Sequence, residues 1–150
     1  MEEKKRQRYQ RLYEQLKGHL QVTDDPVARM ATIVALLHHK ADSYFWTGFY
    51  QLIDGELIVG PYQGFLACQK LKKDTGVCWD AVNRGCSIIV PNVDEFPGHI
   101  ACDSRSKSEI TVPCIDDNDQ VYAVLDVDSD KINSFDEIDA EGLERIVSLL

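Results

Sequence analysis

The sequence predicts an α+β domain in which helices pack on a central antiparallel sheet. Apolar residues recur at helical spacing within the first 41 residues, which predicts helices there. Two pairs of β-rich runs follow, and each pair is joined by a turn-forming segment, as in antiparallel hairpins. A helical pattern ends the chain, so helices flank the strands rather than alternating with them. The 150 residues are expected to form one domain.

The N-terminal part, residues 1–41, is predicted to contain two helices. The first runs from about Glu3 to Leu20, where apolar residues recur at every third or fourth position. The second begins at Pro26, with Asp25 as its N-cap, because proline suits the first helical position and aspartate accepts a hydrogen bond from the first turn.

The middle part, residues 42–130, is predicted to hold the sheet and its loops. Strands over 44–53 and 56–60 meet at Asp54-Gly55, a dipeptide typical of tight hairpin turns. A second hairpin joins residues 109–115 to residues 120–128.

Connections and short elements fill the space between these hairpins. Residues 61–75 are expected to form a long connection, followed by a short helix over 77–84 that Gly85 ends as a left-handed C-cap. A strand is expected over 86–90. Residues 92–107 show no apolar period and predict a long loop, which in a compact domain is usually functional or disordered.

The last helix is predicted over residues 134–150. It opens with Ser134-Phe135-Asp136-Glu137, the S-x-x-E pattern of a capping box.

Composition excludes several functional classes. Sixteen Lys and Arg stand against 25 Asp and Glu, and the formal net charge of -9 argues against a nucleic-acid partner. A hydrophobic fraction of 44% excludes a disordered chain. No secretory signal and no apolar run of membrane-spanning length are recognisable, so we expect a cytoplasmic protein with no membrane partner.

Five cysteines cannot all pair within one chain, and cytosolic cysteines are more often catalytic or metal-binding than structural. Cys102 lies in a polar loop, a poor place for a packing residue. Cys78 lies at the expected start of a helix, whose dipole would lower its pKa. Cys68 precedes a lysine-rich stretch that would also favour a thiolate. Packing in a helix for Cys78 and at the core edge for Cys68 remain alternatives.

The other two cysteines are expected to pack in the core. Cys86 and Cys114 each lie in an apolar, β-rich run, where a thiol behaves as a small hydrophobic group. The remaining three thiols would suit a nucleophile with one or two resolving partners.

Acidic and aromatic pairs also suggest a site. Asp126 and Asp128 fall on one face of a predicted strand, where two carboxylates repel each other and raise one pKa, and Glu109 on the neighbouring strand could join them. A solvated strand end is the alternative. Trp46 and Tyr50 share a strand face, with Gly48 leaving open space between them. They could wall a small apolar group or belong to the core.

A metal site is the weaker interpretation of the thiols. His99, Cys102, Cys68 and Cys78 could form a four-ligand zinc set, but the sequence has no C-x-x-C pair and lacks structural-zinc spacing. No phosphate-binding or dinucleotide motif is present, so no cofactor is expected.

Several segments carry motifs of one known family. They are Gly76-Val77-Cys78, Pro97-Gly98-His99-Ile100-Ala101-Cys102-Asp103, Ser106-Lys107-Ser108-Glu109-Ile110, Leu125-Asp126-Val127-Asp128-Ser129, Trp46-Thr47-Gly48-Phe49-Tyr50 and Gly60-Pro61-Tyr62-Gln63-Gly64. The chain from about residue 44 onward resembles the free methionine-R-sulfoxide reductases, GAF-domain enzymes that reduce the R-sulfoxide of free methionine. The resemblance implies a single GAF-like domain with a long active-site loop.

The resemblance also implies roles for the cysteines. Cys102 matches the nucleophile, Cys68 the cysteine that resolves its sulfenic acid, and Cys78 a third thiol that can enter disulfide exchange. A thioredoxin-type reductant would restore the thiols, and no metal or organic cofactor would be required. The sequence does not decide whether the protein forms a homodimer.

Five further residues match the family's substrate site. Glu109, Asp126 and Asp128 correspond to its carboxylates, and Trp46 and Tyr50 to its aromatic wall. A non-catalytic GAF sensor of a small ligand and a thiol redox switch are the competing functions. Three thiols in loops and at a helix start would have no purpose in a sensor, and a switch would yield no methionine.

Overall fold

The computed structural model describes residues 1–99 and 102–150. Its helices are α1 (Glu2–His19), α2 (Pro26–Lys40), α3 (Val77–Arg84) and α4 (Glu137–Val147), with 3₁₀ turns at Leu20–Val22 and Val93–Glu95. Its strands are β1 (Trp46–Ile53), β2 (Glu56–Gln63), β3 (Lys70–Leu71), β4 (Ile88–Val90), β5 (Ser108–Ile115) and β6 (Val121–Ser129). The predicted α+β class is confirmed. Among the described helices, none combines the length and apolar character needed to cross a membrane.

The strands form one sheet in the order β3-β2-β1-β6-β5-β4, and every neighbouring pair is antiparallel. Strands β1, β6 and β5 lie in the middle and have partners on both sides. Because this pairing satisfies their backbone groups, the two faces of the sheet differ only in the side chains that they carry.

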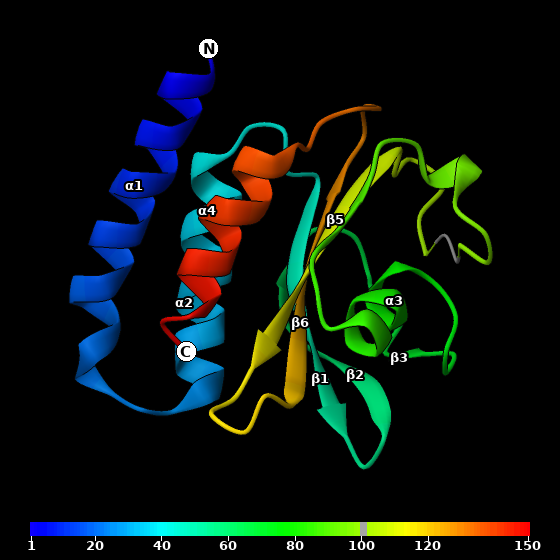
Figure 1. Ribbon diagram of the computed structural model, residues 1–150, viewed down its shortest axis with the longest axis horizontal. Helices are drawn as coiled ribbons and strands as arrows, with labels where there is room; N and C mark the ends of the chain where they lie inside the picture. The colour runs from blue at the N-terminus through cyan, green and yellow to red at the C-terminus, as the bar shows by residue number, and fades with distance from the viewer. Residues whose placement is uncertain (100–101) are drawn as a thin grey trace.

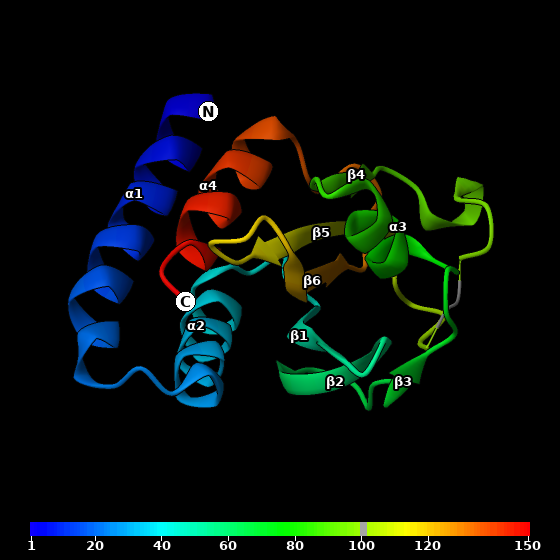
Figure 2. The same cartoon turned by 60° about the horizontal axis from the view of Figure 1, so that its bottom comes forward.

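Helices α2 and α4 pack on one face of the sheet with α1 on their outer side, and α3 with its adjoining loops covers the other face (Figures 1 and 2). Alternation along the strands separates the two layers. Phe49, Leu125 and Val127 are fully buried in the core under the three helices, whereas Trp46 and Val124 pack on the α3 side. The large core therefore lies under the three helices, and the α3 side is left for the site.

Three predicted boundaries are confirmed by their local chemistry. The Asp25 side chain accepts a hydrogen bond from the Ala28 N–H at 2.8 Å, and Pro26 occupies the first helical position of α2. Gly85 ends α3 with φ 65°, the left-handed conformation that glycine adopts at low cost. The turn between β1 and β2 is the predicted Asp54-Gly55, with both residues at positive φ.

The predicted capping box at Ser134 and Glu137 is wrong. Helix α4 is capped by Asp136, which accepts from the Asp139 N–H at 3.2 Å, while the Asp139 side chain accepts from the Asp136 N–H at 2.8 Å. The Ser134 hydroxyl donates to the Ser129 hydroxyl at 2.7 Å instead. Ser134 with Glu137 and Asp136 with Asp139 both have the spacing of a capping box. Because Ser134 is engaged by tertiary contacts, Asp136 caps the helix.

Strand boundaries differ from the prediction by two residues or more at three points, the first being the start of β1 at Trp46 rather than at Tyr44. Strand β2 continues to Gln63 and pairs with the short β3, so part of the expected connection belongs to the sheet. Strand β4 begins at Ile88 rather than at Cys86, because the chain must first leave the left-handed Gly85. Cys86 is consequently exposed, and its predicted burial is wrong, whereas Cys114 on β5 is buried as predicted.

A buried polar cluster ties α1 to the rest of the fold. The Tyr9 hydroxyl donates to Asp139 Oδ1 at 2.5 Å and lies 2.7 Å from the Tyr44 hydroxyl, just before β1. Lys5 forms ion pairs with Asp139 and, at 2.9 Å, with Asp136. Burial raises the pKa of both tyrosines, so they remain neutral hydrogen-bonding groups. The cluster joins α1, the N-terminus of α4 and the entry to β1.

Close packing of α1 on α4 leads to the first prediction. A Cβ at Gly142 would overlap the ring of Tyr9, whereas a Cβ at Gly18 would meet no atom within 4 Å. We expect Gly142→Ala to lower the free energy of unfolding by about 1–3 kcal/mol. Gly18→Ala, the control, should raise it by up to about 1 kcal/mol. Urea unfolding of the two variants measures both effects, and equal stabilities would contradict the packing.

Candidate active site

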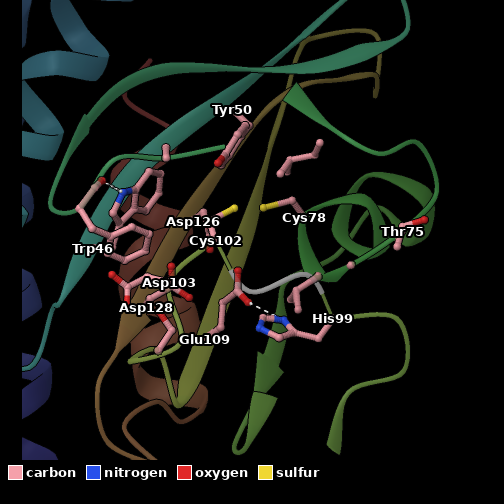
Figure 3. Close-up of a pocket in the computed structure, with 16 residues that line it drawn as sticks. Trp46, Tyr50, Thr75, Cys78, His99, Cys102, Asp103, Glu109, Asp126 and Asp128 are labelled. Atoms are coloured by element: carbon pink, nitrogen blue, oxygen red, sulfur yellow. Dashed lines mark hydrogen bonds and ion pairs between the residues drawn. The ribbon is translucent and has the colours of Figure 1, made fainter. Parts of the chain in front are cut away.

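A pocket opens on the α3 side of the sheet (Figure 3). Strands β1, β5 and β6, the start of α3 and the loop before β5 all contribute to its wall. Seven of the eight predicted site residues line it, namely Trp46, Tyr50, Cys78, Cys102, Glu109, Asp126 and Asp128. The eighth, Cys68, is covalently joined to Cys102. Topology therefore brings together residues that lie up to 82 positions apart in the sequence, from Trp46 to Asp128.

Three buried carboxylates line the pocket side by side. Glu109 on β5 is paired with Asp128 on β6, and Asp126 lies two residues before Asp128 on the same face. Their exposed fractions are 5%, 7% and 6% for Glu109, Asp128 and Asp126. The alternative of a solvated strand end is therefore wrong, because α3 and the neighbouring loops cover this part of the sheet.

Burial and mutual repulsion govern the charge of these groups. Burial, and then the charges of Asp126 and Asp128, raise the pKa of Glu109 well above its usual range. Burial and Asp126 do the same for the pKa of Asp128. The pKa of Asp126 is also raised by burial. Protonated carboxyl groups are thus favoured near neutral pH whenever no cation accompanies them.

His99 is the basic side chain beside this cluster, and it was not among the predicted substrate-site residues. Its Nδ1 lies 3.8 Å from Glu109 Oε1, and burial lowers the pKa of its ring. A mostly neutral imidazole neutralises little of the carboxylate charge. The feature of the sequence that could have identified His99 as a site residue is its position in the G-H-I-A-C-D loop. Ile100 and Ala101 of that motif lie outside the described residues.

Cys68 and Cys102 form a disulfide whose Cα atoms are 5.8 Å apart. Cys68 lies in the segment between β2 and β3, and its backbone carbonyl accepts a hydrogen bond from the Tyr50 hydroxyl at 3.1 Å. Tyr50 thus fixes the backbone that carries one of the two bonded sulfurs. The disulfide also takes two thiols from the four-ligand zinc set considered above, so that set does not form in this state.

The environment of Cys78 differs from the prediction. It lies in the first turn of α3, but it is buried, and burial followed by the charges of Asp126 and Glu109 raises its thiol pKa well above the usual range. The expected lowering by the helix dipole is wrong, because desolvation and nearby carboxylates outweigh the dipole of an eight-residue helix. Cys78 is a protonated thiol whose sulfur points into the pocket (Figure 3).

An aromatic wall faces the disulfide. The rings of Trp46 and Tyr50 stack with centroids 5.9 Å apart, and Tyr62 stacks on Trp46 at 5.3 Å. The Trp46 indole donates to the Phe65 carbonyl at 3.1 Å. The space above Gly48 is not open as predicted, since the Trp46 ring and Tyr62 fill it. The absence of a Cβ at Gly48 allows the indole to lie flat against β1.

The loop after Cys102 is held by a contact that sequence reasoning missed. Arg105 binds the Asp103 carboxylate through two nitrogens, at 2.9 and 2.6 Å, and lowers the pKa of that carboxyl to about 2. The Arg105 guanidinium also lies over the Phe45 ring at 4.9 Å. Asp103 and Arg105 are two residues apart in a loop, and this spacing of an acidic and a basic residue could have predicted the ion pair.

Fold and site together define a GAF domain. The GAF-domain family matches residues 29–150. GAF domain-containing protein A of Dictyostelium discoideum is 45% identical over 97% of this chain and 92% of its own length. Free methionine-R-sulfoxide reductase of Escherichia coli strain K12 is 40% identical over 83% of this chain and 74% of its own length.

A solved structure is also similar. Free methionine-R-sulfoxide reductase from Neisseria meningitidis, in complex with its substrate, superposes with a TM-score of 0.88 at 38% identity, covering 94% of this chain and 84% of that one. The chain belongs to the free methionine-R-sulfoxide reductase family of GAF-domain proteins.

The raised carboxyl pKa values predict how stability depends on pH. Because the folded state holds protons on Glu109 more tightly than the unfolded chain does, this group's contribution is greatest at low pH and is lost as pH rises through its folded pKa. We expect Glu109→Gln to be more stable than the parent at pH 8 by about 1–3 kcal/mol, with the gain vanishing near pH 4. Denaturant unfolding across this range measures the difference.

The matched control is Glu95→Gln, which neutralises an exposed carboxylate outside the pocket. Its stability should follow that of the parent at each pH. Parallel pH profiles for the parent and Glu109→Gln would contradict the assigned pKa direction.

Proposed function

We propose that this protein reduces free L-methionine-(R)-S-oxide to L-methionine. The observation that carries the proposal is the Cys68–Cys102 disulfide, which joins the predicted nucleophile to the predicted resolving cysteine beside a pocket with three buried carboxylates. Membership of a family whose members bear the name of this activity supports it further.

The first step uses Cys102 as the nucleophile. Its thiolate attacks the sulfoxide sulfur while the sulfoxide oxygen takes up a proton, and the oxygen passes to the cysteine sulfur. Methionine leaves, and Cys102 becomes a sulfenic acid. A carboxyl group of the cluster is the proton donor, because the raised pKa values of Glu109 and Asp128 keep a proton available near neutral pH.

The carboxylate cluster would also select free methionine over a methionine residue. A carboxylate in the cluster can bind the α-ammonium group, which a methionine within a peptide lacks. The N–H groups at the start of α3 lie beside the pocket and are suited to the α-carboxylate. Trp46 and Tyr50 would contact the methyl and thioether end, to which their stacked rings offer an apolar surface.

The second step restores the thiols. The Cys68 thiol attacks the sulfenic sulfur of Cys102, releases water and forms the disulfide. A thioredoxin-type dithiol then reduces this disulfide and is itself oxidised. Such a cycle requires a compartment that keeps thiols reduced, which is consistent with the cytoplasm and with a role under oxidative stress.

The nucleophile assignment is tested by Cys102→Ser. We expect this variant to lose turnover of the R-sulfoxide by about 10³-fold or more, because serine cannot take the oxygen to form a sulfenic acid. Methionine release is measured with separated R and S sulfoxides and a thioredoxin system. Cys86→Ser, which changes an exposed thiol outside the pocket, should retain full activity. Retention of activity by Cys102→Ser would remove Cys102 from the mechanism.

The resolving step is tested by Cys68→Ser. This variant should release one methionine per chain and then stop, with Cys102 trapped as a sulfenic acid that a dimedone reagent labels. Continued cycling in Cys68→Ser that stops in Cys68→Ser/Cys78→Ser would assign resolution to Cys78. A parent protein that forms the disulfide with peroxide but releases no methionine would instead be a redox switch, and one that does neither would be a sensor.

A further inference from the structure

We propose that Cys78, Glu109 and Asp126 form a binding site for a thiophilic divalent cation, with Zn²⁺ as the fitting ion. The Cys78 sulfur and one oxygen of each carboxylate lie within 4.8 Å of one another, and all three residues are buried. They come from three elements, α3, β5 and β6, so their meeting is a product of the tertiary fold. Figure 3 shows Cys78, Glu109 and Asp126 around the same pocket.

An unpartnered oxygen supplies an independent reason to expect a ligand there. Asp126 Oδ1 is buried and accepts no hydrogen bond from the described residues, although Asp126 is only 6% exposed. Nε2 of His99, whose Nδ1 lies 3.8 Å from Glu109, is likewise buried without a partner within the described part of the chain. Buried polar atoms of folded proteins almost always have a partner, so this oxygen calls for either a proton shared within the cluster or a cation bound from outside the chain.

The local charge balance favours a cation over a neutral donor. Within the described chain, the one ion pair made by Glu109, Asp126 or Asp128 is that of Glu109 with His99. Arg105 is not among the residues that line the pocket, and it is engaged with Asp103. Three carboxylates therefore face one cavity without a lysine or arginine partner, and a divalent ion would compensate two of their charges.

The donor set selects the kind of ion. A thiolate with two carboxylates matches Zn²⁺, Cd²⁺ or Co²⁺, whereas Mg²⁺ and Ca²⁺ prefer oxygen alone. Zinc takes sulfur at about 2.3 Å and carboxylate oxygen at about 2.0–2.2 Å, so the three donors would close around the ion by roughly 1 Å. A water would complete four-coordination, because among the described residues no nitrogen of His99 lies within 4.8 Å of all three donor atoms.

Binding of the ion would have a regulatory consequence. The ion would occupy the position that the proposed function gives to the substrate's ammonium group, so ion and substrate would exclude each other. This second part of the inference rests on the proposed function, whereas the binding of the ion does not. The site would hold the enzyme inactive when free zinc rises and release it when zinc falls.

Cobalt titration tests the site without any turnover. The protein is used with the Cys68–Cys102 disulfide intact and with Cys86→Ser, which removes the exposed thiol. We expect one Co²⁺ per chain, a thiolate-to-cobalt absorption band in the near ultraviolet, and displacement of cobalt by Zn²⁺. Adding Cys78→Ser should abolish the band and weaken binding about 100-fold, while adding Cys114→Ser, which alters a buried thiol in the other core, should change neither.

Asp126→Asn provides the second variant and should weaken cobalt binding while circular dichroism confirms that it is folded. Absence of the band, or a band that persists in Cys78→Ser, would overturn the site. Competition is then measured in Cys68→Ser/Cys86→Ser/Cys102→Ser, which cannot turn over. Methionine-R-sulfoxide should displace cobalt from this variant, and failure to displace it would overturn the shared position alone. An active enzyme without cobalt binding would leave the proposed function intact.

Discussion

The antiparallel register of β5 and β6 is the constraint on which the site depends. It places Glu109 opposite Asp128 and Thr111 opposite Asp126, so that three carboxylates share one face of two adjacent strands. A register shift of one residue would turn the carboxylates into the core under the helices and would move Ile110, Val112 and Leu125 out of that core. The core on one face therefore enforces the carboxylate cluster on the other.

Buried carboxylates that repel one another lower the stability of the folded protein near neutral pH, so the remaining structure must offset that effect. The three-helix layer does so with a continuous apolar core, in which Phe49, Leu125 and Leu143 are fully buried. Tyr9 and Asp139 connect α1 and α4 to the chain just ahead of β1. The apolar packing that stabilises the fold is thus concentrated under the helices, whereas the reactive side chains lie on the α3 side of the sheet.

Sequence patterns were sufficient where a local rule acts alone. Strict alternation along β6 predicted that Asp126 and Asp128 share a face, and Asp54-Gly55 fixed the first hairpin. Sequence patterns were insufficient where tertiary contacts determine the burial or the pKa of a side chain. Cys86 lies in an apolar run, yet the turn after α3 exposes it. The carboxylates that raise the pKa of Cys78 approach from strands 31 and 48 residues further along, which no spacing rule reveals.

These environments also explain how Cys68 and Cys78 would differ in use if Cys102 is the nucleophile, as proposed. Cys68 lies in a half-buried segment between strands, held by the Tyr50 hydroxyl at its carbonyl, and it is the residue bonded to Cys102. Cys78 is buried beside carboxylates that oppose its ionisation. Since the thiolate is the attacking species in disulfide exchange, the proposed cycle is faster through Cys68 whenever the carboxylates are charged. A cation that neutralises them would favour the Cys78 thiolate, and the same ion would then be held by it.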